Sequence, residues 1–255
     1  MAIHRDDDGE AVTLTISNPD RKNAISVEDS VTLADHIHDV AHDDSVRCVV
    51  LTGEGDAFCS GLDLSAGMGS GGPSAELERG LNRIARGLLQ MEKPTVAKVH
   101  GAAVGAGASL ATACDFVYAS QDAVFGWGFT NIGLAPDTGA TYVLPRLIGV
   151  RRAFELLATG EEISAEEAVA LNIVNDALPA ADLDGFVEER VATLLNRPTK
   201  AVAEAKRLVY RNSHRSLEEA LQGEARAQEE MITTDDFAEG VAAFAEKRDP
   251  EFTGQ

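Results

Sequence analysis

Apolar and polar positions follow two different periods along the first half of the chain. Residues 11–16 alternate enough to predict a half-buried strand. Residues 46–52 form a short apolar run rich in β-branched side chains, which is typical of a buried strand. Two more strands are predicted over residues 95–100 and 115–119. Because helical segments lie between these runs, we expect an α/β fold with a mostly parallel sheet and crossover connections.

Helices of the first half are predicted from capping residues and apolar stripes. Ser26 and Asp29 resemble a capping box. The apolar face of the helix that follows would consist of Val27, Val31, Ala34, Ile37 and Ala41. A second helix is predicted over residues 75–91 and ends before Pro94. A helix of small residues is predicted to end near residue 113.

From about residue 138 onward the pattern is largely helical. Ser164 and Glu167 predict another capping box. Further helices are predicted over residues 181–195, 199–211, 216–231 and 234–247. A shift in composition lies between Pro179 and Pro198. We therefore predict an α/β core over residues 1–195 and a helical C-terminal region over residues 196–255.

The composition is that of a globular chain with an acidic surface. Hydrophobic residues make up 44% of the 255 residues, and no apolar run approaches the length of a membrane-spanning helix. The short apolar runs lead us to expect no membrane partner. The formal net charge of −20 repels phosphate backbones, so we also expect no nucleic-acid partner. The excess of Asp and Glu over Lys resembles proteins that work in concentrated salt, which we hold as a hypothesis.

The first residues lack the basic start and apolar core of a signal peptide. Cys48, Cys59 and Cys114 include no CxxC pair, and we expect reduced, buried thiols in a cytoplasmic protein. His38 and His42 imitate a zinc-protease helix, but Asp replaces the Glu that such a motif requires and no third ligand is evident. We therefore predict no metal site.

Two segments each offer a backbone N–H beside a glycine, where no side chain blocks the approach of a ligand. The first, AFCSGLDL, covers residues 57–64, and the second lies within residues 100–110 at the start of a helix. If the two turns converge, both N–H groups can point at one oxygen, and the helix dipole adds to the positive potential there. Such a pair stabilises an enolate formed from a thioester, and removing one donor costs about 3–4 kcal/mol.

These segments also carry a family resemblance. Residues 18–25 (NPDRKNAI), 57–64 and 100–115 (HGAAVGAGASLATACD) resemble, in order and separation, the three signatures of the crotonase (enoyl-CoA hydratase/isomerase) family. Residues 133–149 and 237–254 resemble later family segments. The resemblance implies a crotonase-like spiral of ββα units with a helical C-terminal trimerisation region, forming trimers or pairs of trimers. It implies an acyl-CoA substrate and no permanently bound cofactor, because coenzyme A arrives as part of the substrate.

The resemblance assigns roles to individual residues. The oxyanion-hole amides would be those of Leu62 and Ala106, and Ala106 replaces the middle one of three family glycines. The coenzyme A contacts would be made by Arg21, Lys22, Ala24, Ser60, Gly61, Asp63 and Leu64. For Arg21 and Lys22 the alternative is a solvated basic pair.

The acids of the family differ between hydratases and isomerases. Ser109 and Phe129 stand where a hydratase of the family has its two glutamates, and neither can accept a proton as a carboxylate can. Asp137 stands at a third position, where some isomerases of the family have their acid. The alternative for Asp137 is a cap of the helix that follows.

Four side chains are predicted to line the substrate site: Ser109, Trp127, Phe129 and Leu134. For Trp127 and Phe129 the alternative is the hydrophobic core, and for Ser109 it is an inert helix serine. If Asp137 is catalytic, the apolar side chains of Leu62, Phe129 and Leu134 should raise its pKa, because burial disfavours the charged form.

The resemblance is closest to isomerase members with a single catalytic Asp. We therefore expect an enoyl-CoA isomerase that moves a double bond through a dienolate. The alternatives are an enoyl-CoA hydratase with a non-standard acid pair and a catalytically silent acyl-CoA-binding protein.

Overall fold

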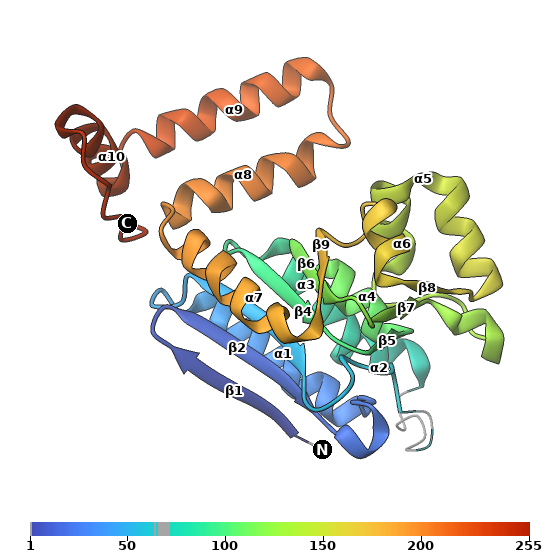
Figure 1. Ribbon diagram of the computed structural model, residues 1–255. Helices are drawn as coiled ribbons and strands as arrows, with labels where there is room; N and C mark the ends of the chain where they lie inside the picture. Colours follow the sequence, from blue (N-terminus) through green and yellow to red (C-terminus); the bar gives the residue numbers. More distant parts are fainter. Residues whose placement is uncertain (1, 64, 66–71) are drawn as a thin grey trace.

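The main sheet has six strands in the order β1-β2-β3-β4-β6-β9 (Figure 1). The computed structural model describes residues 2–63, 65 and 72–255. Its first two strands, β1 (Ala2–Asp8) and β2 (Ala11–Ser17), are antiparallel. The others run parallel to β2: β3 (Cys48–Gly53), β4 (Thr95–Val99), β6 (Phe116–Ser120) and β9 (Asp176–Leu178). The predicted parallel sheet is confirmed, and β1 and β9 were not predicted.

A second sheet has three strands in the order β5-β7-β8. They are β5 (Ala102–Val104), β7 (Val124–Gly126) and β8 (Glu162–Ser164). β5 runs parallel to β7, and β7 runs antiparallel to β8. Three residues are too few to establish an alternating pattern, which is why the sequence predicted none of these strands.

The capping box of Ser26 and Asp29 is confirmed at the start of α1 (Val27–His42). The predicted apolar face of α1 is only partly correct. Its buried residues are Ser30, Leu33, Ala34, Ile37 and Val40, whereas Val27, Val31 and Ala41 are half-buried. The buried face of α1 is therefore rotated from the predicted one, and α3 (Leu81–Gln90) is the helix against which α1 mainly packs.

The helix predicted over residues 75–91 is two helices, α2 (Pro73–Arg79) and α3 (Leu81–Gln90). The break lies at Gly80, where a Cβ atom would collide with the side chain of Ser30 in α1. Close contact with α1 therefore excludes a side chain at residue 80. The predicted helix of small residues is α4 (Ala106–Ala113), which is buried along its whole length.

The second half of the chain is mainly helical. Its helices are α5 (Ala140–Thr159), which is broken at Gly149, α6 (Ala165–Ala170), α7 (Ala180–Leu195), α8 (Thr199–Asn212), α9 (Leu217–Met231) and α10 (Asp235–Glu246). Within the ranges that the structure describes, 3₁₀ helices cover Pro19–Arg21 and Gly128–Ile132. Ser164 caps α6 as predicted, but the Glu167 carboxylate pairs with Arg152.

The C-terminal helices α8, α9 and α10 extend away from the two sheets (Figure 1). Lys206 fastens α8 to the core. Its Nζ donates to the carbonyl oxygens of Leu88 (2.8 Å) and Lys93 (3.2 Å) and lies 2.8 Å from the Asp115 carboxylate. None of the described helices combines the length and the apolar character that crossing a bilayer requires.

Candidate active site

The two glycine turns predicted from the sequence lie against each other. Gly61 has φ +100°, a backbone conformation that favours glycine. A Cβ atom on Gly61 would lie 3.0 Å from the Val104 carbonyl oxygen and 3.5 Å from the Ala106 nitrogen. The first turn therefore touches the second turn at the residue where α4 begins.

A short ladder of hydrogen bonds holds the turns in this position. The Cys59 N–H donates to the Ala102 oxygen (2.9 Å), and the Val104 N–H donates to the Cys59 oxygen (2.9 Å). A Cβ atom on Gly107 would lie only 2.9 Å from the Cys59 Cβ. The Cys59 carbonyl oxygen would be nearer still, so residue 107 has no room for a side chain, whereas Ala106 accommodates its methyl group.

Two backbone donors without internal acceptors lie on these adjoining turns. Ala106 is the first residue of α4, so its N–H has no acceptor within the helix. Within the described residues, neither the Ala106 N–H nor the Leu62 N–H donates to a protein acceptor. The arrangement can therefore present two N–H groups to one external oxygen.

Asp137 and Leu62 line the same cavity, which has a volume of about 220 Å³. The rest of its wall comes from α1, α2, α3 and the segment before Asp137: Val27, Ser30, Pro73, Glu76, Leu77, Leu81, Leu134, Ala135 and Pro136. Most of these side chains are apolar. The carboxyl group of Asp137 is thus held in an apolar environment beside the first glycine turn.

The alternative role of Asp137 as a helix cap is wrong. The N-cap of α5 is Gly139, which makes no side-chain cap bond. The Asp137 carboxylate accepts a hydrogen bond from the Thr138 hydroxyl (2.7 Å). Burial raises the pKa of Asp137 above its ordinary value, and the Thr138 hydrogen bond offsets part of this effect. The direction agrees with the prediction.

Glu76 is a second carboxyl group in the cavity wall, and the sequence analysis missed it. Its side chain is only 7% exposed, and its Oε2 lies 3.2 Å from Nη1 of the exposed Arg79. Glu76 precedes Leu77, which begins the apolar stripe that continues through Leu81. The sequence signal that could have revealed Glu76 was a charged residue next to this apolar stripe.

Of the four side chains predicted to line the substrate site, one lies in the cavity wall and three do not. Leu134 is in the cavity wall and 38% exposed. Trp127 and Phe129 belong to the main hydrophobic core. Ser109 is buried, and its hydroxyl donates to the Gly105 oxygen (3.1 Å), which supports the start of α4. These last three residues are not part of the 220 Å³ cavity wall.

The predicted coenzyme A residues come together beside Gly61. The Ser60 N–H donates to the Lys22 oxygen (2.9 Å), and the Ser60 hydroxyl donates to the Arg21 oxygen (3.1 Å). The Arg21 guanidinium pairs with Asp63. Ala24 follows in the same turn, and Leu64 lies outside the described residues. The Arg21 side chain is 51% exposed, so its ion pair with Asp63 lies at the surface and leaves both readings of Arg21 and Lys22 open.

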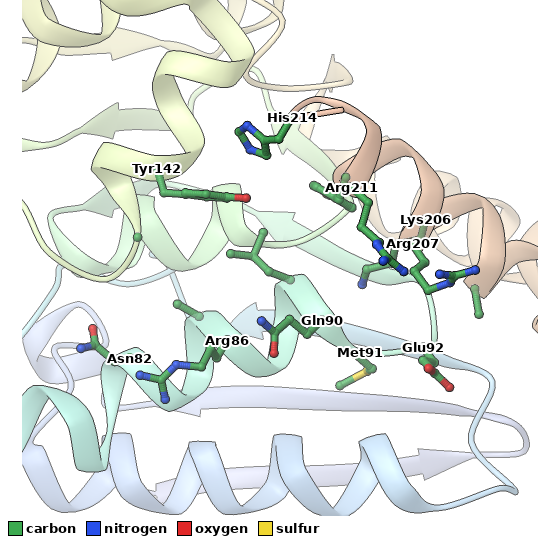
Figure 2. A pocket seen from close by; sticks show the side chains of 15 residues that line it. Asn82, Arg86, Gln90, Met91, Glu92, Tyr142, Lys206, Arg207, Arg211 and His214 are labelled. Atoms are coloured by element: carbon green, nitrogen blue, oxygen red, sulfur yellow. The ribbon is translucent and has the colours of Figure 1, made fainter. Parts of the chain in front are cut away.

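A larger cavity of about 690 Å³ lies between α3, α5 and α8. Figure 2 shows Arg86 of α3 on one side and Lys206, Arg207 and Arg211 of α8 on the other. Three of these cations already have partners: Arg86 pairs with Glu78, Lys206 with Asp115, and Arg207 with Glu204. The predicted site residues line none of this wall, so the smaller cavity is the candidate site.

The three cysteines are free and buried. Burial raises the pKa of the Cys48 and Cys59 thiols to about 12, and it also raises the pKa of Cys114. Among the described residues, no group of three or more His, Cys, Asp or Glu side chains is placed to hold a metal ion.

Comparisons with a family model and with curated proteins point to the same enzyme family. The model of the enoyl-CoA hydratase/isomerase family matches residues 8–255. A probable enoyl-CoA hydratase of Rhodobacter capsulatus is 40% identical over 246 residues, which cover 95% of this chain and 94% of that protein. The 1,2-epoxyphenylacetyl-CoA isomerase of Escherichia coli is 35% identical, with 96% and 95% coverage.

The fold is also shared with solved structures. The crystal structure of an enoyl-CoA hydratase from Bacillus anthracis superposes with a TM-score of 0.94 at 33% identity, covering 99% of both chains. The arrangement of sheets and helices is thus the one that the sequence resemblance implied.

Proposed function

Because the chain belongs to the enoyl-CoA hydratase/isomerase family, we propose that it is an enoyl-CoA isomerase with Asp137 as its acid–base group. The contact between Gly61 and the turn at 104–106 carries this proposal. It supports an oxyanion hole made by the N–H groups of Leu62 and Ala106.

In the proposed reaction, the thioester carbonyl oxygen accepts hydrogen bonds from Leu62 and Ala106. The Asp137 carboxylate takes a proton from C2 of a β,γ-unsaturated acyl group. The electron pair moves toward the carbonyl oxygen and forms a dienolate, which the two donors stabilise. Asp137 returns the proton to C4, and the double bond moves from C3–C4 to C2–C3.

The coenzyme A portion would lie along Arg21, Lys22, Ala24, Ser60, Gly61, Asp63 and Leu64, as the family resemblance implies. We also propose a cytoplasmic trimer or pair of trimers built through the C-terminal helices. Exposed apolar side chains on α8, α9 and α10 support this assembly: Val209, Leu217, Leu221, Phe237, Val241 and Phe244.

A hydratase is the second candidate, because the 40% identical relative is a probable enoyl-CoA hydratase. Incubation with a 3-enoyl-CoA and, separately, with a 2-enoyl-CoA distinguishes the two. A gain in the absorbance of the conjugated thioester from the 3-enoyl substrate supports the isomerase. Loss of that absorbance from the 2-enoyl substrate supports the hydratase. If neither changes while CoA esters bind, the chain is a silent acyl-CoA-binding protein.

A further inference from the structure

Two carboxyl groups face the 220 Å³ cavity, and the proposed reaction uses only one of them. Asp137 lies in the segment before α5, whereas Glu76 comes from α2. Ser30 is the other polar side chain of the wall, and its hydroxyl donates to the Val27 oxygen within its own helix (2.6 Å). Glu76 is therefore the polar feature of the cavity that still needs a role.

The surroundings of Glu76 leave one of its oxygen atoms without a partner. Arg79 Nη1 contacts Oε2, and within the described residues Oε1 accepts no hydrogen bond. Oε1 is not sealed inside the protein, so it is open to the cavity or to solvent and can accept a hydrogen bond from a ligand. Binding sites commonly place a few such polar groups in an apolar wall, where they select ligands.

We infer that Glu76 is a specificity-determining residue that selects acyl groups carrying a hydroxyl beyond C3. The hydroxyl would donate to Glu76 Oε1. Because Arg79 already balances the charge of Glu76, a neutral donor suits the site better than a cation. The cavity of about 220 Å³ has the volume of about seven liquid waters at about 30 Å³ each, so we take a six-carbon acyl chain as the probe.

The inference rests on the proposed function, since it treats this cavity as the acyl site. Saturated acyl-CoA esters cannot isomerise, so their binding reports on the cavity separately from turnover. Suitable probes are hexanoyl-CoA and the hexanoyl-CoA esters with a hydroxyl at C3, C4, C5 or C6, and their dissociation constants can be measured by calorimetry.

We expect a hydroxyl at one of the positions C4 to C6 to tighten binding about tenfold or more, as a hydrogen bond to a charged group does. Glu76→Leu should abolish that preference. Glu76→Gln, which keeps an acceptor oxygen and the side-chain volume, should retain part of it. Glu78→Leu changes an exposed residue of the same helix and should leave the preference intact.

Equal binding of all the esters overturns the inference, as does a preference that Glu76→Leu leaves unchanged in a folded protein. A preference for the C3 hydroxyl alone also overturns it, because that hydroxyl belongs to the product of hydration. Failure of the wild-type protein to convert 3-hexenoyl-CoA would count against the proposed isomerase and not against the binding result.

Discussion

At the scale of single residues, the two carboxyl groups of the cavity differ in what stabilises their charge. Glu76 has the Arg79 guanidinium beside it. Among the described residues, Asp137 receives a side-chain hydrogen bond from the Thr138 hydroxyl alone, and burial raises its pKa. A carboxyl group that takes up a proton readily suits acid–base work, and one that is ion-paired suits recognition.

Asp137→Asn should lower isomerase kcat about 10²-fold or more, because the amide cannot take up the C2 proton. In the wild-type protein, kcat/KM should fall on the acid side at a pH above the ordinary carboxyl pKa of about 3.9, since Asp137 must be ionised to act as a base. A pH–rate profile measures both effects. Asp122→Asn, at an exposed site, is the control, and near wild-type turnover of Asp137→Asn would refute the assignment.

The same substitution should increase stability at neutral pH. A raised pKa in the folded state means that folding favours protonated Asp137, so stability falls as pH rises from the ordinary carboxyl pKa of about 3.9 through the raised folded-state pKa. Asn removes this effect. Urea unfolding should show Asp137→Asn more stable than wild type at pH 7, with the difference disappearing below about pH 4. A variant that is less stable at pH 7 would show that the carboxylate has a stabilising partner.

At the scale of elements, the site depends on how closely two turns approach. Gly61→Ala places a methyl group 3.0 Å from the Val104 oxygen at φ +100°. We expect it to push the turns apart and lower kcat at least tenfold, as misplacement of an oxyanion donor does. Gly9→Ala is the control, because Gly9 also has positive φ but has open space around it. Gly9→Ala should reduce only thermal stability.

The sequence predicted the elements whose pattern is long and regular. The strand at 11–16 and the Ser26 cap are examples, and the glycine turns were placed from their motifs. The break at Gly80 was missed, and the contact that excludes a side chain there comes from Ser30 in another helix, which the local pattern does not show. Glu76 was missed for the same reason: its place in the cavity wall depends on α2 packing beside the segment that ends at Asp137.

At the scale of the whole molecule, the extended C-terminal helices need fixed attachment to the core. Lys206→Met should destabilise the protein by about 3 kcal/mol, since it leaves the largely buried Asp115 without its cation. Urea unfolding measures the loss, and limited proteolysis should cut near α8 more readily. The exposed Lys200→Met on the same helix is the control. Equal stability of the two variants would mean that other contacts hold α8.

The net charge of −20 also acts on the whole molecule. Repulsion among surface carboxylates opposes the compact state, and salt screens it. The thermal midpoint should therefore rise as KCl increases from none to molar concentration. Equal thermal midpoints without KCl and at molar KCl would refute the hypothesis that the protein is adapted to high salt.

The ladder between Cys59 and the second turn has a practical consequence. Cys59 is wholly buried, its thiol has a pKa of about 12, and its backbone bonds directly to Ala102 and Val104. An alkylating reagent attacks the thiolate, which burial makes scarce and inaccessible. Labelling of Cys59 thus requires local opening of the chain, and its rate measures how often the two glycine turns separate.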